Sequence, residues 1–418
     1  MNRSSSLVKL ARRILEEAEK LEDNNVNEDS TRALFEATRE LQTSVMTVPR
    51  LLEEHLLHYQ YLSCLDWLVR FRIFNYVPTD SGSISYTDLA KKAGVPIMRL
   101  RSVARMAMTE GFFFEPSATE IAHTQLSASL AADTSFQNWI SWTTQYGMSI
   151  ACRFAEATAK WPSSGAKNET AFNVAFDTDL ALWEYMKTKP EMEKVFSGYM
   201  RGTSQSEGGR LQHLINGFDW ASLGEATIVD VGGSTAHASL ALASAFPRLQ
   251  FIVQDLPEVV QQGKAVLPQL ASDAVTSRVR FAAHDFFMPQ PPRDSGSAPD
   301  IYLLRRVLHD WSDEQAHEIL QHLAVAIQDG GNPRARLIIM DAIVPAPGTL
   351  SRVQEATIRF RDLTMAQLFN TKERELNEWK QLFAATDPRL HLKSWKQPTG
   401  SYLAVMEVQI DEQSSISC

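Results

Sequence analysis

Cysteine is scarce in this chain of 418 residues, and the three that occur, Cys64, Cys152 and Cys418, are far apart. They supply neither a disulfide framework nor a zinc site, which fits a reducing compartment. The amino-terminal segment has a charged amphipathic pattern without the apolar core of a secretion signal, and its acidic residues are atypical of a transit peptide. We therefore expect a cytoplasmic protein.

Long apolar runs and a surplus of basic residues are also missing. No apolar stretch approaches the length that spans a bilayer. Lysine and arginine number 41 against 50 aspartate and glutamate, so the formal net charge is −9 and there is no basic stripe for a phosphate backbone. We expect no membrane span and no nucleic-acid partner. Because 418 residues exceed the usual limit for one hydrophobic core, two domains are the natural expectation.

The amino-terminal part is helical by hydrophobic period. Residues 1–48 predict a helical arm, and residues 49–132 predict a winged-helix-like domain that begins with a long apolar helix at Pro49. Two further helices, Tyr86–Ala93 and Pro96–Glu110, precede two short strands. The arm and the long helix carry more apolar surface than one small domain can cover, which predicts a homodimer.

Three arginines, Arg99, Arg101 and Arg105, lie on the second of these helices, where a winged helix could read DNA. They alternate with apolar positions, and the chain as a whole is acidic. We therefore interpret this region as a packing and dimerisation module rather than as a DNA reader.

Residues 133–215 predict a helical linker that is rich in aromatic side chains. Most of these rings are expected to lie in the core, and a minority could form the wall of a pocket for a flat aromatic ligand. The sequence does not identify which rings those are.

Strands and helices alternate over residues 216–418. Such alternation predicts an α/β domain with a parallel sheet and helices on both faces. The strands are expected at Ala226–Val231, Leu249–Gln254, Val279–Ala282, Ile301–Leu304, Arg336–Met340 and Tyr402–Val408.

The strongest local signal is a buried strand that runs into Gly232 and Gly233 and then into a helix. This pattern predicts free backbone N–H groups at the carboxyl end of the strand, where open α/β sheets bind ligands. Asp255 ends the second strand, about twenty-five residues after Asp230, and can accept both hydroxyls of a ribose. Each signal is weak alone, because Gly-Gly turns and capping aspartates are common, but together they favour a nucleoside-bearing cofactor.

Two further motifs follow later strands. After the third strand, Asp285 and Phe286 could bind the amine and cover the face of an adenine, or could be a helix cap and a core ring. After the fourth, His309-Asp310-Trp311 lie at the same edge of the sheet. The pKa of histidine lies near neutrality, which suits a general base. A lone histidine is usually structural, but its place beside the inferred cofactor favours catalysis.

Together with Lys372-Glu373-Arg374, these motifs resemble the S-adenosylmethionine-dependent O-methyltransferases of the plant caffeate type and their fungal polyketide-pathway relatives. The resemblance runs from about Pro49 to Val408. It implies a Rossmann-like class I methyltransferase domain over residues 216–418, preceded by a helical, winged-helix dimerisation domain. It also implies S-adenosylmethionine as the cofactor, and methyl transfer to a hydroxyl of a small aromatic or polyketide-type metabolite.

The resemblance implies a cofactor role for five residues. Gly232 would lie against the methionine part of the cofactor, and Asp255 would hold the ribose. Asp285 and Phe286 would bind adenine. Arg305 would lie beside the cofactor, where the family has a lysine or arginine.

The resemblance also implies the catalytic and substrate residues. His309 would take the proton from the acceptor hydroxyl, and the carboxylates of Asp341 and Glu373 would flank and orient it. Met200 and Asp310 would lie near the acceptor. No metal is required when a histidine removes the proton, and the sequence shows no dense carboxylate cluster that would bind one.

Four positions depart from the family pattern. Ser234 and Ala236 stand where glycines are usual, Asp341 where glutamate is usual, and Thr371 where glycine is common. The methyl group of Ala236 could crowd the cofactor or tighten the start of the helix. The altered loop leaves open a pericyclase on the same fold, which would dehydrate or cyclise a pyridone-like substrate without methyl transfer. A third interpretation is a non-catalytic dimeric binding module.

Overall fold

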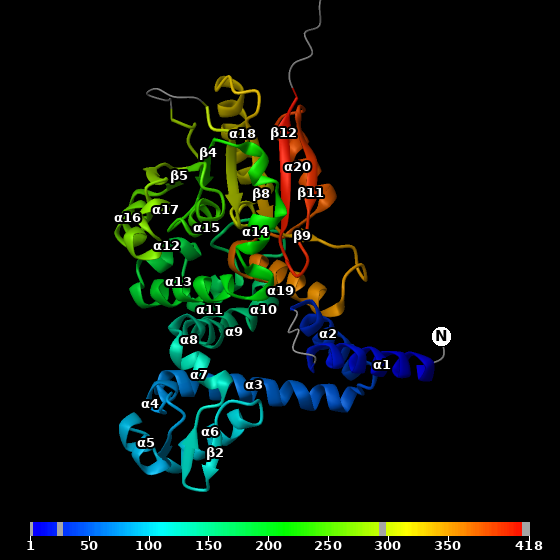
Figure 1. The fold of residues 1–418 in the computed structure, drawn as a ribbon, viewed down its shortest axis with the longest axis vertical. Coiled ribbons are helices and arrows are strands. Elements are labelled where there is room, and N and C mark those ends of the chain that lie inside the picture. The colour runs from blue at the N-terminus through cyan, green and yellow to red at the C-terminus, as the bar shows by residue number, and fades with distance from the viewer. Residues whose placement is uncertain (1–2, 23–27, 292–297, 412–418) are drawn as a thin grey trace, which may run out of the picture. The chain divides into compact units, whose positions relative to one another are not determined.

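The computed structural model describes residues 3–22, 28–291 and 298–411, and the chain divides into two compact units (Figure 1). The first unit comprises residues 1–162 and 168–205, and the second comprises residues 163–167 and 206–418. Each unit is described separately. Among the described residues, no helix is both long enough and apolar enough to cross a bilayer.

Three long helices open the first unit: α1 (Arg3–Glu22), α2 (Glu28–Ser44) and α3 (Val48–Arg70). These confirm the predicted helical pattern, and Pro49 lies in the first turn of α3, where its missing N–H costs nothing. The amino-terminal half of α3 exposes an unusual number of large apolar side chains. They are Val48, Leu51, Leu52, Leu56, Leu57 and Tyr59.

The next part of the first unit is a small module of helices and one sheet. Its helices are α4 (Ile73–Tyr76), α5 (Tyr86–Ala93) and α6 (Ile97–Met108), and its antiparallel sheet has the order β1 (Ser83–Ser85), β3 (Glu120–Ala122), β2 (Phe114–Ser117). Helices α5 and α6 and strands β2 and β3 were predicted, whereas α4 and β1 were not.

Two of the arginines on α6 are engaged within this module. Arg105 forms an ion pair with Glu115 on β2, with 2.8 Å between Nε and Oε1. Arg101 donates to the carbonyl of Ala118 and lies over the ring of Tyr86. These contacts support the packing interpretation of the helix.

The rest of the first unit is helical, as predicted, and contains a dense aromatic cluster. Helices α8 (Thr134–Ser141) and α13 (Pro190–Ser204) approach closely because Gly198 and Gly202 have no side chains; a Cβ at Gly198 would lie 2.1 Å from Asn138 Nδ2. The other elements are α7 (Gln125–Ala132), a π-helix at Trp142–Gly147, α9 (Met148–Ala151), α10 (Phe154–Lys160), α11 (Ala171–Phe176) and α12 (Leu182–Lys187).

The second unit is built on a sheet of seven strands (Figure 1). The strand order is β11 (Leu390–Lys396), β12 (Ala404–Ile410), β8 (Arg336–Asp341), β7 (Ile301–Arg305), β4 (Ala226–Val231), β5 (Leu249–Asp255), β6 (Val279–Ala283). The predicted strands are therefore present, and the α/β fold class is confirmed.

One feature of the predicted sheet is wrong. Strands β4 to β8 pair in parallel, but β12 runs antiparallel to β8, and β11, which was not predicted, pairs antiparallel with β12. The loop that joins β11 to β12 is too short for a helical crossover, so these two strands can pair with each other only in the antiparallel direction. The sheet is mixed rather than parallel.

Helices cover both faces of this sheet and enclose two apolar cores. One core includes buried side chains of α14 (Gln212–Gly217), α15 (His237–Ala245) and α19 (Arg352–Phe369). The other includes those of α18 (Asp313–Asp329) and α20 (Leu376–Thr386). The remaining elements are 3-10 turns at Glu207–Gly209, Trp220–Leu223 and Leu308–Asp310, α16 (Pro257–Leu270), α17 (Asp273–Thr276), β9 (Ile343–Val344) and β10 (Arg374–Glu375).

Candidate active site

The turn after β4 lies at the carboxyl edge of the sheet and is tied to the end of β5. The N–H groups of Gly232 and Gly233 both donate to the carbonyl of Gln254, at 2.9 and 3.2 Å, and the N–H of Ser234 donates to Asp255 Oδ2 at 2.9 Å. The expectation of free N–H groups is therefore wrong for these three residues. The positive φ of Gly232, 69°, turns the chain back so that these donors face β5.

Both glycines of this turn are required by close packing. A Cβ at Gly233 would lie 2.6 Å from Asp230 Cγ and 2.8 Å from Val253 Cγ1. A Cβ at Gly232 would lie 3.1 Å from Val307 Cγ2, in addition to the cost of a positive φ. The absence of side chains thus keeps the turn flat against its neighbours.

Ala236 adopts a left-handed backbone conformation at the start of α15, with φ of 69°. For a residue with a Cβ this conformation costs roughly 1 kcal/mol. Its methyl group is fully buried in the core on that face of the sheet. Of the two alternatives for this departure, burial in the core favours tighter packing at the helix start over crowding of a ligand.

Three charged groups gather around this turn. Asp255 accepts from Ser234 and, through Oδ1, from the N–H of Leu256 at 2.8 Å, and burial raises its pKa. Asp230 is buried, accepts from Ser239 Oγ at 2.6 Å, and has a pKa raised by burial to about 6. Burial lowers the pKa of Arg305 to about 10, opposed by the charge of Asp230. Among the described residues, Arg305 Nε has no hydrogen-bond partner.

The aromatic pair after β6 lies beside the same turn. A Cβ at Gly232 would lie 3.6 Å from the ring of Phe286, and Phe286 meets the edge of Trp311 with 5.6 Å between ring centroids. Asp285 is exposed and accepts from the N–H of Phe287 at 3.0 Å. The structure thus brings Phe286 to the turn, with Asp285 next to it in the chain and open to solvent.

His309 lies in the 3-10 turn that follows β7 and is 4% exposed. Its Nδ1 lies 3.1 Å from Glu373 Oε1 and 3.4 Å from Asp341 Oδ1, and its Nε2 lies 3.5 Å from Asp310 Oδ1. Asp341 ends β8 and Glu373 precedes β10, so three separate segments meet at this imidazole. The three predicted catalytic residues, His309, Asp341 and Glu373, are brought together, and Asp310, predicted as a substrate contact, lies beside them.

These carboxylates control the charge of the histidine. Burial disfavours the imidazolium, but the negative charges of Asp341, Glu373 and Asp310 outweigh it and raise the pKa of His309 to about 9. Burial raises the pKa of Asp341, while the charges of His309 and Arg361 overcome burial and hold the pKa of Glu373 below its usual range. Near neutral pH the histidine is therefore charged and Glu373 is its ionised partner.

His309, Asp341 and Glu373 form a dense cluster, which the sequence did not predict. One ligand-type atom from each of His309, Asp341 and Glu373 lies within 4.8 Å of the others, a spacing that a metal ion could also use. The expectation that no dense carboxylate cluster forms is wrong, because Asp341 and Glu373 are remote in sequence and meet only through the fold. A cation is already present: Arg361 Nε lies 3.5 Å from Glu373 Oε1.

Two residues for which no role was predicted hold the cluster in place. Asp362 on α19 accepts from the N–H of Glu373 at 3.0 Å. Arg374 is buried and donates to the carbonyls of Leu308 and Trp311, at 2.9 and 2.8 Å. The place of Arg374 beside Glu373 in the motif Lys372-Glu373-Arg374 was the available sequence signal for this anchor.

Thr371, which departs from the family's glycine, also has a structural role. Its hydroxyl donates to the carbonyl of His309 at 2.8 Å. Met200 lies on α13, in the first unit, so its predicted place near the acceptor is not tested by the geometry of the second unit.

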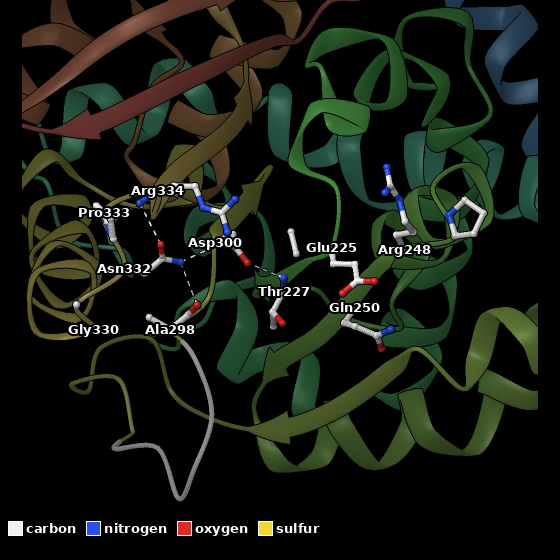
Figure 2. Close-up of a pocket in the computed structure, with 13 residues that line it drawn as sticks. Glu225, Thr227, Arg248, Gln250, Ala298, Asp300, Gly330, Asn332, Pro333 and Arg334 are labelled. Atoms are coloured by element: carbon white, nitrogen blue, oxygen red, sulfur yellow. Dashed lines mark hydrogen bonds and ion pairs between the residues drawn. The ribbon is translucent and has the colours of Figure 1, made fainter.

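A surface pocket lies at the opposite, amino edge of the sheet (Figure 2). Asp300 at its centre accepts from the N–H of Thr227 at 2.9 Å and from Asn332 Nδ2 at 3.2 Å, and it lies 3.6 Å from Arg334 Nη2. These contacts tie loops together at the starts of the strands. Open α/β sheets bind ligands at the other edge, where His309 and Asp255 lie.

Comparison with known proteins agrees with this geometry. A family model described as an O-methyltransferase domain matches residues 159–387. The O-methyltransferase pgmB of Aspergillus terreus is 46% identical over 363 residues, which cover 86% of this chain and 99% of that protein. The solved structure of LepI in complex with SAM is similar in fold, with a TM-score of 0.78 and 22% identity, over 98% of this chain and 100% of LepI.

A second solved structure, described as a pericyclic reaction enzyme, has a TM-score of 0.77 and 21% identity, over 98% of this chain and all of that chain. At this identity the likeness shows the fold alone. The much higher identity to a named O-methyltransferase does not favour the pericyclase alternative.

Proposed function

Since the chain belongs to the S-adenosylmethionine-dependent O-methyltransferase family, we propose that it methylates a hydroxyl of a small aromatic metabolite, with His309 as the general base. The family model and the similar O-methyltransferases confirm the resemblance that the motifs indicated, together with the fold class and the cofactor. The observation that carries the proposed mechanism is the buried imidazole held between Glu373 and Asp310.

The residues at the turn after β4 fit this cofactor. The carboxylate of Asp255 is already fixed by two backbone N–H groups, and each oxygen keeps a free lone pair for a ribose hydroxyl. Phe286 offers a ring face to adenine, and the adjacent Asp285 an acceptor for its amine. The unpartnered Nε of Arg305 and the side-chain-free surface of Gly232 suit the methionine part. When bound, S-adenosylmethionine supplies a methyl group made electrophilic by its sulfonium.

His309 would take the acceptor's proton at Nε2, because Nδ1 is directed to Glu373. A hydrogen bond from Nδ1–H to a carboxylate fixes the tautomer and the orientation of the ring, and it stabilises the imidazolium that forms. Asp310, 3.5 Å from Nε2, would orient the hydroxyl beside it. Burial of His309, Asp341 and Glu373 limits the access of water to the proton transfer, while Asp310 is partly exposed on the side from which the acceptor would enter.

Aromatic side chains of the first unit support a flat acceptor. Trp142 stacks on Tyr199 with 5.6 Å between centroids and 16° between planes, and Phe196 meets the edge of Trp142. Several rings of this cluster are only half-buried, which leaves ring surface for a planar ligand such as a phenolic or pyridone-like polyketide. Met200, on the same helix as Tyr199, belongs to this proposal as an acceptor contact.

The test is release of S-adenosylhomocysteine by the wild type and by His309→Ala, with a panel of phenols and pyridones. The variant should lose about two to four powers of ten in turnover, the usual contribution of a positioned base. The control is the rise in melting temperature that S-adenosylhomocysteine causes. His309→Ala should keep the wild-type rise, because Asp255 and Phe286 remain to bind the cofactor. A product that forms without the mass gain of one methyl group would contradict the proposed methyl transfer and favour the pericyclase alternative.

We also propose that the chain forms a homodimer through residues 1–132, as an arm followed by a winged-helix-like domain, with residues 133–215 as a helical linker. The exposed apolar half of α3 supports this proposal. Light scattering should give a dimer mass for the wild type and a monomer mass for Leu52→Glu/Leu56→Glu. Val325→Glu, at a similarly exposed apolar position on α18, is the matched control.

A cytoplasmic location is proposed on the scarcity of cysteine alone.

A further inference from the structure

The turn that carries His309 is held by an unusual set of contacts. Four successive carbonyls, from Leu308 to Trp311, each accept a hydrogen bond from a side chain that is distant in sequence. Arg374 binds the first and the last, and Thr371 binds that of His309. The third carbonyl, that of Asp310, accepts from Lys167 Nζ at 3.0 Å.

Lys167 makes a second contact with the same turn. Its ammonium lies 3.2 Å from the ring centroid of Trp311, and the indole in turn meets Phe286 and Phe287 edge-on. The lysine is half-buried, and burial lowers its pKa to about 8, opposed by the charge of Asp310. An ammonium that is partly desolvated and placed on an indole is held by specific contacts rather than by chance.

The segment that bears this lysine is itself fixed to the second unit. Residues 163–167 group with that unit although the residues on both sides of them belong to the first. Asn370, next to Thr371, donates from Nδ2 to the carbonyl of Ala166 at 2.7 Å. The short segment is therefore anchored at two points, at the carboxyl-terminal end of α19 and at the turn of His309.

We propose that Lys167 is a positioning residue of the methyl-transfer reaction, which holds Asp310 and Trp311 and thereby sets the orientation of His309 Nε2. The proposal rests on the proposed function of His309. It adds a residue that touches neither the imidazole nor the Gly-rich turn and that connects the two through Asp310 and through Trp311.

The charge of Lys167 has a second consequence. The groups that face His309 are Asp310, Asp341 and Glu373, with Arg306 and Arg361 beyond them. The charges of Arg306 and Lys167 both favour the ionised form of the Asp310 carboxyl. Loss of the ammonium therefore removes part of what keeps a carboxylate beside His309 Nε2.

The experiment compares the full-length wild type with Lys167→Met and Lys167→Arg. Without the ammonium, we expect kcat to fall about tenfold, because a small displacement of the base is costly. Arginine keeps the positive charge and the cation–π contact, so Lys167→Arg should restore most of the wild-type kcat.

Hydrogen exchange of the free protein gives a readout that does not depend on activity. Peptides that contain Leu308–Trp311 should exchange faster in Lys167→Met and close to the wild-type rate in Lys167→Arg. Lys160→Met is the matched control, because Lys160 also lies over an indole, that of Trp161, at 4.2 Å but belongs to the first unit. It should match the wild type in kcat and in exchange.

Wild-type kcat in Lys167→Met would overturn the proposal, whether or not exchange increased, since the contact would then be structural only. A tenfold loss that arginine does not restore would also overturn it. Full activity of His309→Ala would instead defeat the proposed function, while the exchange result would still report whether Lys167 holds the turn.

Discussion

The two halves of the site satisfy their buried polar groups in different ways. On the cofactor side, Asp255 accepts two backbone N–H groups and Asp230 accepts a serine hydroxyl. On the base side, within the described part of the chain, neither oxygen of Asp341 has a hydrogen-bond partner, and nor does Oε2 of Glu373. Both carboxylates are almost fully buried.

This contrast separates binding from proton transfer. A carboxylate held by backbone donors is preorganised and loses little on ligand binding. A buried carboxylate without such donors must interact with the nearest movable charge, here the proton of His309. The carboxylates of the cofactor side thus have their hydrogen bonds before a ligand arrives, whereas the carboxylates of the base side depend on where the proton of His309 lies.

The largest effect is expected for removal of the ionised partner of the base. Glu373→Gln should lower kcat by about a hundredfold or more, because the charge that fixes the imidazole and stabilises the imidazolium is lost. Asp341→Asn should cost less, because Glu373 accepts a hydrogen bond from the imidazole at 3.1 Å, whereas Asp341 Oδ1 lies 3.4 Å from Nδ1 and forms no hydrogen bond with it. Initial rates at saturating substrates measure both, and an equal or reversed ranking would contradict this division of roles.

The cofactor side should respond in affinity rather than in turnover. Asp255→Ala should weaken binding of S-adenosylhomocysteine by roughly tenfold to a hundredfold, the value of hydrogen bonds to a charged acceptor. Titration calorimetry would measure this loss, with Asp273→Ala, an aspartate at the start of the short helix α17, as the control. Unchanged affinity in Asp255→Ala would remove Asp255 from the ribose site.

The pH dependence should report the charge of His309. Its pKa is raised to about 9, and only the neutral form can accept a proton, so kcat/KM should rise with pH from neutrality toward about 9. Glu373→Gln removes one of the negative charges, so its acid limb should lie at lower pH. A wild-type limb at or below 6.5, the ordinary value, would show that the carboxylates do not control the base.

The smallest effect is expected at the helix start on the cofactor side. Ala236→Gly should relieve the positive φ and stabilise the protein by up to about 1 kcal/mol, less whatever the loss of the buried methyl costs. Urea unfolding measures the difference, with Ala241→Gly in the middle of α15 as a control that should destabilise. Destabilisation by Ala236→Gly would mean that packing of the methyl outweighs the strain.

Local patterns predicted the cofactor half more completely than the base half. The strand Ala226–Val231 and the turn after it are contiguous, so the alternation of apolar and small residues was sufficient. The direction of the loop's N–H groups was not, because it depends on the backbone conformation of Gly232. Strand β11 was missed because it lies at the edge of the sheet and is mostly polar and exposed.

The base half depends on contacts between remote segments. His309 was identified by its place after the fourth strand of the sheet, and Asp341 and Glu373 through the resemblance to the family, but the density of their cluster was not evident from spacing along the chain. Lys167 lies in no recognisable motif and reaches Asp310 across 143 positions in sequence. A contact at that separation is fixed by the packing of the unit as a whole, and a single sequence gives no local signal for it.

The antiparallel position of β12 has a consequence for how the protein is made. Every residue of β8 but Arg336 is buried, and one edge of this strand pairs only with β12. A ribosome adds about 5–20 residues per second, so β8 emerges several seconds before residues 404–410 exist to cover it. During that interval the nascent chain presents an apolar strand with an open edge, which is a template for association with other chains. Production of this protein in a foreign host should therefore benefit from slow translation or abundant chaperones, and a chain that stops before Ala404 should aggregate.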